Sequence, residues 1–373
     1  METSKFRLGY IPALDGIRGM AIILVMMAHA NVPFAQGGFI GVDIFFVLSG
    51  FLITALLLKE FDEHATIHFK RFYMRRILRL LPALIVMLIV LNLLSVILLN
   101  TVERQNNLID SFIALFYLSN WTFALGFRPL FFLTHTWSLS SEEQFYILWP
   151  IILFLLLRMQ SSKEKIFGIV LALATASWLW RVILTITVMS YPRVFFSLDT
   201  RMDGLLMGCA LAILIAINPH QLMKWAHRTP FIPVATVVII GLMGLITDGN
   251  STSTPFWSIA SVGLLTTITV FYFVINPTSW LKSFFELKPL VFVGRISYGL
   301  YLWHYIIFKY MTDYLHMSWA GTLIIGGGLA LLISLLSYYF IEQPILSLKS
   351  KFSVPTRRII HEPDSLVTPS TSG

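Results

Sequence analysis

Long apolar segments separated by short polar or basic stretches dominate the chain. Most of them are long enough to cross a bilayer as an α-helix, which takes about 20 residues. The segment 109–125 is shorter, and we expect the stretch 101–142 around it to be re-entrant or partly inserted. The pattern predicts an all-α integral membrane protein with about ten transmembrane helices, near 13–33, 39–58, 79–99, 143–157, 166–187, 203–217, 231–247, 256–275, 290–310 and 319–342.

The composition supports this prediction. Of the 373 residues, 57% are hydrophobic and 12% are charged, whereas a soluble domain carries about 25% charged residues. The single cysteine, Cys209, excludes a disulfide framework and a thiolate metal cluster, and we expect no metal cofactor. The net charge of +8 does not indicate nucleic-acid binding, because in a membrane protein the location of positive charge matters more than its sum.

The distribution of lysine and arginine orients the chain. With a cytoplasmic N-terminus and 101–142 on the outer side, 21 of the 27 Lys and Arg residues fall in or beside cytoplasmic stretches, as the positive-inside rule requires. We therefore predict a multi-pass protein of the bacterial cytoplasmic membrane with both termini inside. Residues 1–348 form its membrane-embedded domain, and the polar stretch 349–373 forms a disordered cytoplasmic tail.

Three ionisable residues share one face of the first predicted helix. Arg18 and His29 are eleven residues apart, a spacing that returns to nearly the same face about 16 Å further along the axis. Asp15 lies close to the same stripe. Ionisable groups inside a bilayer are costly and tend to be functional. The structural alternative for His29 is a hydrogen bond to a neighbouring helix.

Other polar residues gather at two depths of the oriented chain. The outer half holds His29, Asp43, Glu143 and His304. The cytoplasmic mouth is marked by the basic cluster of Arg75, Arg76 and Arg79. Two structural alternatives stay open: Glu143 can close a capping box with Ser140 at the N-cap, and the arginines can serve only as a positive-inside anchor.

This arrangement favours acyl transfer across the membrane. A histidine can take a proton from a hydroxyl near neutral pH, a carboxylate can orient it, and arginines bind phosphate groups through paired hydrogen bonds. We expect His29 to be the general base or a transient acyl carrier, Glu143 to orient or charge the site, and Arg18 to stabilise the donor or the oxyanion. Donor phosphates are assigned to Arg75, Arg76 and Arg79, and substrate contacts to Asp15, Asp43 and His304.

Five motifs in order resemble the acyltransferase 3 family of integral membrane O-acyltransferases, which modify lipopolysaccharide, peptidoglycan, Nod factors and macrolides. They are LDGIRG at 14–19 with His29 after it, GVDIFFVLSG at 41–50, FYMRRILR at 72–79, TWSLSSEEQFY at 136–146 and ISYGLYLWH at 296–304. The resemblance implies a ten-helix domain that takes acetyl-CoA or another acyl-CoA as co-substrate and acts on a carbohydrate. It also implies that Arg18 and His29 act in catalysis, together with the arginine cluster and Glu143.

Many members of that family append a periplasmic SGNH esterase-like domain. We expect a stand-alone form here, which transfers directly to its acceptor or through a separate extracytoplasmic partner protein. The competing function is a transporter or flippase that uses the same polar path; the lack of visible internal repeats argues mildly against it. An inactive relative that acts as a membrane sensor or scaffold is a third alternative, and the presence of Arg18, His29 and Glu143 argues against it.

Overall fold

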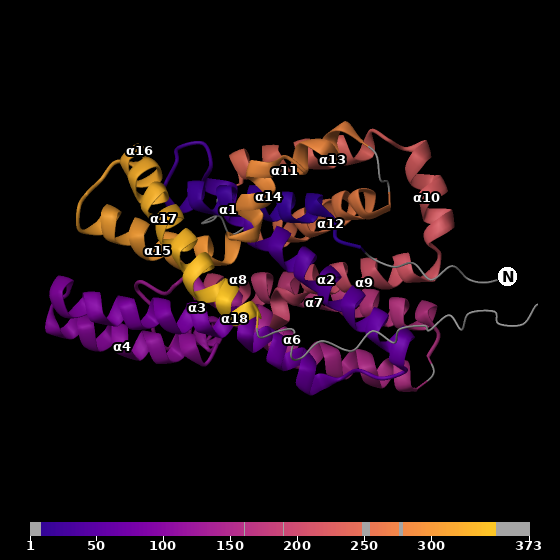
Figure 1. Ribbon diagram of the computed structural model, residues 1–373, viewed down its shortest axis with the longest axis horizontal. Helices are drawn as coiled ribbons and strands as arrows, with labels where there is room; N and C mark the ends of the chain where they lie inside the picture. Colours follow the sequence, from indigo (N-terminus) through magenta and orange to yellow (C-terminus); the bar gives the residue numbers. More distant parts are fainter. Residues whose placement is uncertain (1–8, 160, 189, 248–253, 276–278, 348–373) are drawn as a thin grey trace, which may run out of the picture.

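The computed structural model describes residues 9–159, 161–188, 190–247, 254–275 and 279–347. Within these ranges every regular element is a helix (Figure 1), which confirms the predicted all-α class. The predicted tail 349–373 lies outside the described residues. The α-helices are α1 Pro12–His29, α2 Gly41–His64, α3 Phe69–Leu98, α4 Thr101–Leu115, α5 Ser119–Ala124, α6 Thr136–Arg158, α7 Lys163–Thr187, α8 Tyr191–Phe196, α9 Met202–Ile217, α10 Pro219–Arg228, α11 Ile232–Ile246, α12 Thr254–Ile275, α13 Trp280–Phe285, α14 Lys288–Arg295, α15 Ser297–Asp313, α16 Trp319–Gly321, α17 Gly327–Ser337 and α18 Gln343–Ser347.

Seven helical segments of the described chain are long and apolar enough to cross a membrane, as expected of a multi-span membrane protein. Two more spans result if the bent pairs α9–α10 and α14–α15, with bends of 106° and 72°, each count as one crossing. Helix α11 is apolar but has only 15 residues, fewer than the roughly 20 that a perpendicular span needs. The exact number of ten spans therefore stays a prediction.

Glycines allow the long helices to pack backbone to backbone. A Cβ atom at Gly50 of α2 would lie 1.9 Å from the carbonyl oxygen of Leu205 on α9, and one at Gly294 of α14 would lie 1.8 Å from that of Asp15 on α1. Small residues at helix interfaces permit this close approach in membrane proteins. These contacts hold α14 against α1 and α9 against α2, and α1 also packs against α2 (Figure 1).

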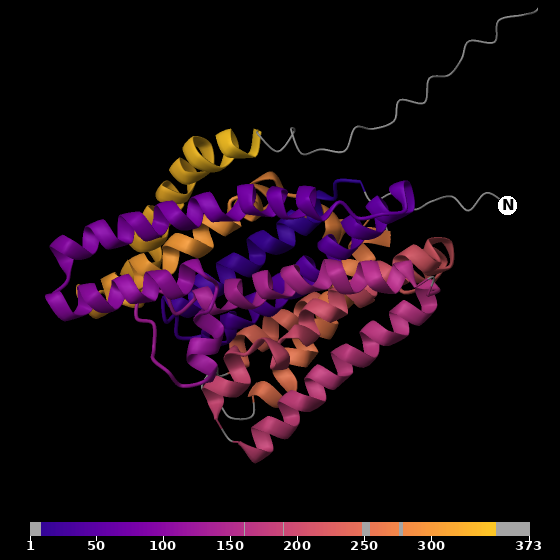
Figure 2. The ribbon, with the colours of Figure 1, turned by 90° about the horizontal axis from the view of Figure 1, so that it is seen from below.

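Helix α4 turns back along the second half of α3, as Figure 2 shows. Asn92 of α3 hydrogen-bonds to Ser111 and Asn107 of α4. Helix α6 then runs antiparallel to α3, because Arg76 contacts Glu143 while Tyr73, earlier in α3, reaches the carbonyl of Ile147, later in α6. The chain between α3 and α6 therefore makes no net crossing of the bundle.

Two helix starts predicted from hydrophobicity were wrong by seven residues or more. The third span was expected from residue 79, but α3 begins at Phe69, so the arginine cluster lies inside a helix. The fourth span was expected from residue 143, but α6 begins at Thr136. The capping-box alternative for Glu143 fails for the same reason, since Ser140 lies inside α6 and donates a hydrogen bond to the carbonyl of Thr136.

Candidate active site

A cavity of about 380 Å³ lies between α1, α2, α3, α6 and α15. Ligand sites typically have volumes of about 300–1,000 Å³. The cavity begins among exposed side chains at the end of α2, including Lys59 and His64, and its floor is formed by the buried Ser138 of α6 and Tyr301 of α15. It is therefore open at the α2–α3 end of the bundle and closed towards the opposite end.

The three arginines of the predicted basic cluster all line this cavity, but they are not equivalent. Arg75 pairs with Glu60 across 3.6 Å. Arg76 donates a hydrogen bond of 2.8 Å to Glu143 and lies 3.6 Å from the centre of the Tyr146 ring. Arg79 lines the cavity from the first half of α3 and makes no ion pair with a described residue. Two of the three charges are thus already balanced by carboxylates.

Arg18 is the second arginine of the cavity without a carboxylate partner among the described residues. Its Nε and Nη2 atoms lie 3.4 Å from Oγ of Ser297, at the start of α15. Tyr298, which follows Ser297 in α15, donates a hydrogen bond to the carbonyl of Leu80 on α3, and this contact places the adjacent Arg79 at a similar depth. Together with Arg76, these two arginines face the carboxylates of Glu142 and Glu143, so this part of the cavity lining carries one more positive than negative charge.

Glu143, expected at the depth of His29, lies at the cavity wall and accepts a hydrogen bond from Arg76. The neighbouring Glu142 also lines the cavity and accepts hydrogen bonds from Ser49 and, at 2.6 Å, from Tyr146. These contacts join α2, α3 and α6. Sequence reasoning did not include Glu142, Ser49 or Tyr146 among the site residues, although all three lie inside motifs quoted above.

His29 and His304 are in direct contact. Nδ1 of His29 lies 2.9 Å from Nε2 of His304, and Nδ1 of His304 lies 2.8 Å from the carbonyl oxygen of Leu300. The two rings are stacked with centroids 5.1 Å apart. Sequence reasoning missed a third histidine, His135. It is buried, and its ring centroid lies 6.0 Å from that of His304.

The histidine pair does not line the cavity, because Tyr301 lies between the cavity and the two histidines. The hydroxyl of Tyr301 forms a 2.6 Å hydrogen bond with Ser138 and donates to the carbonyl of His135 at 2.9 Å. The Tyr301 ring lies 5.6 Å from that of His304. Passage from the cavity to the histidine pair therefore requires the Tyr301 and Ser138 side chains to move.

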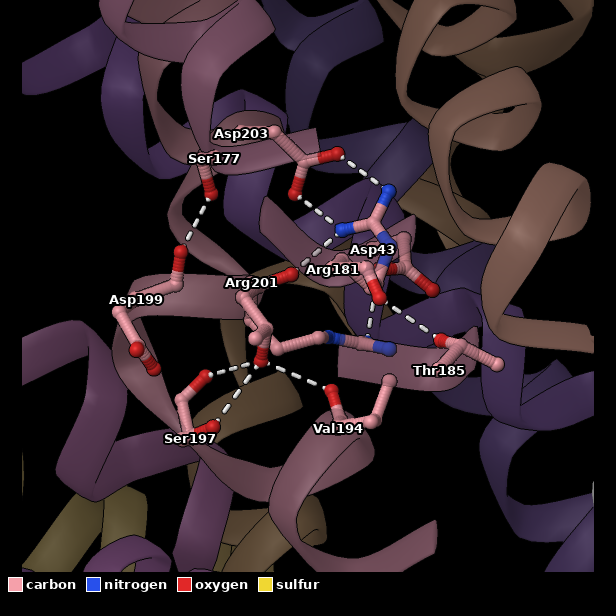
Figure 3. Close-up of polar contacts among 10 residues, drawn as sticks. Asp43, Ser177, Arg181, Thr185, Val194, Ser197, Asp199, Arg201 and Asp203 are labelled. Atoms are coloured by element: carbon pink, nitrogen blue, oxygen red, sulfur yellow. Dashed lines mark hydrogen bonds and ion pairs between the residues drawn. The ribbon is translucent and has the colours of Figure 1, made fainter. Parts of the chain in front are cut away.

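Asp43 and Asp15 lie away from the cavity. Asp43 forms a buried ion pair of 2.8 Å with Arg201, next to a second buried pair in which Arg181 contacts both carboxylate oxygens of Asp203 at 2.7 Å (Figure 3). Asp15, in the first turn of α1, accepts a hydrogen bond from Tyr10. Neither carboxylate is among the cavity-lining side chains, so the structure gives their predicted substrate contacts no geometric support.

Comparison with known proteins identifies the family. A model of the acyltransferase domain matches residues 11–339, so the chain belongs to this acyltransferase family, and the resemblance seen in its motifs is confirmed. Within the described residues no group of three or more His, Cys, Asp or Glu side chains is arranged to hold a metal ion.

Curated relatives share about a third of their aligned residues with this chain. The peptidoglycan O-acetyltransferase OatA of Listeria monocytogenes is 34% identical over 369 residues, which cover 92% of this chain and 57% of the relative. A putative O-acetyltransferase of Staphylococcus aureus is 34% identical, with coverage of 92% and 58%, and the putative peptidoglycan O-acetyltransferase YrhL of Bacillus subtilis is 34% identical, with 90% and 55%. The chain thus spans a little over half the length of these relatives. No solved structure matches it significantly.

Proposed function

We propose that this protein is a transmembrane O-acetyltransferase that moves an acetyl group from acetyl-CoA, bound at the α2–α3 end, to a hydroxyl of an envelope glycan at the opposite end. The observation that carries the proposal is a cavity open at one end, lined by two arginines that have no carboxylate partner among the described residues, with a histidine pair beyond its floor. Peptidoglycan is the acceptor class suggested by the names of the relatives.

The arginines are proposed to divide the work of binding the donor. Arg18 and Arg79 carry the unbalanced charge, and so they hold the anionic part of the CoA thioester. Arg75, whose contact with Glu60 is long and partly exposed, can exchange this partner for a donor phosphate near the mouth. Arg76 is held by Glu143 and Tyr146, so we assign both residues of this ion pair to positioning the cavity wall.

The chemical step is assigned to His29. Its imidazole takes the proton from the acceptor hydroxyl, the hydroxyl oxygen attacks the thioester carbonyl, the C–S bond breaks, and the CoA thiolate leaves and is protonated. In the alternative in which His29 carries the acetyl group transiently, the same ring attacks the thioester first. Tyr301 and Ser138 move aside in either route, because they separate the cavity from His29.

The membrane topology completes the proposal. The α2–α3 end, which carries the basic cluster, faces the cytoplasm of a bacterial cell, and both termini lie on the same side. The acceptor is then extracytoplasmic, and the acetyl group reaches it directly or through a separate partner protein. Residues 1–348 form the catalytic membrane domain.

The test uses membranes that contain the full chain, acetyl-CoA labelled in the acetyl group, and peptidoglycan fragments. We expect labelled ester and free CoA to form only when acceptor is present. His29→Ala, Arg18→Ala and Arg79→Ala should abolish the transfer at unchanged protein levels. Arg158→Ala is the matched control, since this arginine is exposed at the end of α6 and outside the cavity. Movement of acceptor across the membrane without ester formation would instead support a flippase.

A further inference from the structure

We infer that His304 is a positioning residue that keeps the proton of His29 on Nδ1 and so leaves Nε2 of His29 as the basic nitrogen. The inference rests on the proposed function, in which His29 acts on the acceptor hydroxyl. It assigns to His304 a role different from the substrate contact expected from the sequence.

The hydrogen-bond pattern fixes the protons of both rings. Nδ1 of His304 faces the carbonyl oxygen of Leu300 at 2.8 Å, and because a carbonyl only accepts, this nitrogen carries a proton. An imidazolium is costly at a site with no carboxylate within ion-pair distance among the described residues, so His304 is neutral and its Nε2 is an acceptor. The 2.9 Å contact then requires Nδ1 of His29 to donate.

The remaining nitrogen of His29 is available for chemistry. None of the described residues hydrogen-bonds to its Nε2. The hydrogen bond made by one ring nitrogen determines the protonation of the other, so His304 presents Nε2 of His29 as an unprotonated base. When this base takes a proton, the Nδ1–H bond to His304 becomes charge-assisted and therefore stronger.

Burial shows that His304 acts through His29. The side chain of His304 has 0% exposure, enclosed by the rings of Tyr301 and Phe308, whereas His29 is partly exposed. An acceptor can reach His29 without touching His304. In a catalytic triad, a buried third group holds the histidine in the right tautomer. Here that third group is the imidazole of His304, which is hydrogen-bonded to the backbone of its own helix.

The first experiment measures acetyl transfer by variants in membranes. His304→Leu, which cannot accept a hydrogen bond, should lower kcat by on the order of 10²-fold or more with an unchanged KM for acetyl-CoA. His304→Gln, whose amide oxygen can accept from Nδ1 of His29, should recover activity to within about tenfold of wild type. Leu302→Ala is the matched control, because Leu302 is equally buried in α15 and packs in a cluster that contains neither His29 nor His304; its folded fraction should retain near-wild-type kcat.

The second experiment reads the proton directly by ¹⁵N NMR of histidine-labelled protein in liposomes, with the His29 signals assigned by their loss in His29→Gln. Wild type and His304→Gln should show Nδ1 of His29 protonated and Nε2 unprotonated, and His304→Leu should show a shift towards the other tautomer. Wild-type kcat in His304→Leu, or an unchanged His29 tautomer in that variant, would overturn the inference. If wild type forms no ester, the proposed function fails, while the NMR result still decides the placement of the proton.

Discussion

Replacing Asp43 separates two roles for this residue, a substrate ligand and a structural ion partner. Its carboxylate and the guanidinium of Arg201 lie 2.8 Å apart, with side-chain exposures of 3% and 0%. The guanidinium also lies among aromatic rings, 4.8 Å from that of Phe195 and 5.2 Å from that of Trp137. Oδ2 of Asp43 and both Nε and Nη1 of Arg201 are buried without a hydrogen-bond partner among the described residues.

The size of the expected effect follows from this geometry. Removing one member of a buried ion pair leaves an uncompensated charge and costs about 3–5 kcal/mol, so Asp43→Leu and Arg201→Met should each be strongly destabilised. Removing both charges together is often neutral or stabilising by about 1–4 kcal/mol. Because this pair leaves buried polar atoms unsatisfied, each at a cost of about 1–3 kcal/mol, the double variant should be at least as stable as wild type.

The assay combines thermal unfolding in detergent, followed by size-exclusion chromatography, with acetyl transfer per amount of folded protein. We expect low midpoint temperatures for both single variants, recovery in the Asp43→Leu/Arg201→Met double variant, and wild-type transfer by its folded fraction. If the single variants keep the wild-type midpoint, or if the stable double variant cannot transfer the acetyl group, Asp43 is not the structural partner argued here.

Three shorter predictions address packing, electrostatics and the cavity wall. Gly50→Ala should sharply lower the amount of folded protein, because its Cβ would lie 1.9 Å from a carbonyl oxygen of α9, whereas Gly168→Ala, with no atom within 4 Å, should fold normally in the same chromatographic assay. Burial raises the pKa of Asp199, but hydrogen bonds, above all from Arg193, outweigh burial and hold this pKa below its ordinary value. The ionised Asp199 therefore stabilises the fold above about pH 4, and this contribution is lost as the pH falls through the lowered pKa. In an acid titration, wild type should lose thermal stability more steeply than Asp199→Asn. Glu143→Gln should raise the KM for acetyl-CoA roughly tenfold, because the variant weakens about one charged hydrogen bond to Arg76, and it should leave kcat nearly unchanged in steady-state kinetics. A fall in kcat at constant KM would instead assign Glu143 to the chemical step.

The similar depth of the two histidines, though not their contact, could be anticipated from the sequence. Apolar segments and the basic loops orient the helices, and counting residues from the ends of α1 and α15 brings His29 and His304 to a similar depth. That count predicts depth but not contact, because it contains nothing about which helices are neighbours. The packing of α1 on α14, and the bend into α15, put the two rings side by side.

The position of Glu143 could not be anticipated, for a physical reason that also explains the error for the arginines. A hydrophobic window ends a predicted span where polar side chains begin, but a helix that lines an internal cavity keeps polar side chains inside the span. Helix α6 therefore starts at Thr136, which moves Glu143 roughly two turns into the bundle, and α3 starts at Phe69, ahead of the arginines. The two displacements have one cause, and they bring Arg76 and Glu143 together at the cavity wall. In a membrane protein with an internal cavity, a polar motif at the edge of a hydrophobic segment can therefore mark the part of the helix that lines the cavity rather than the end of the helix.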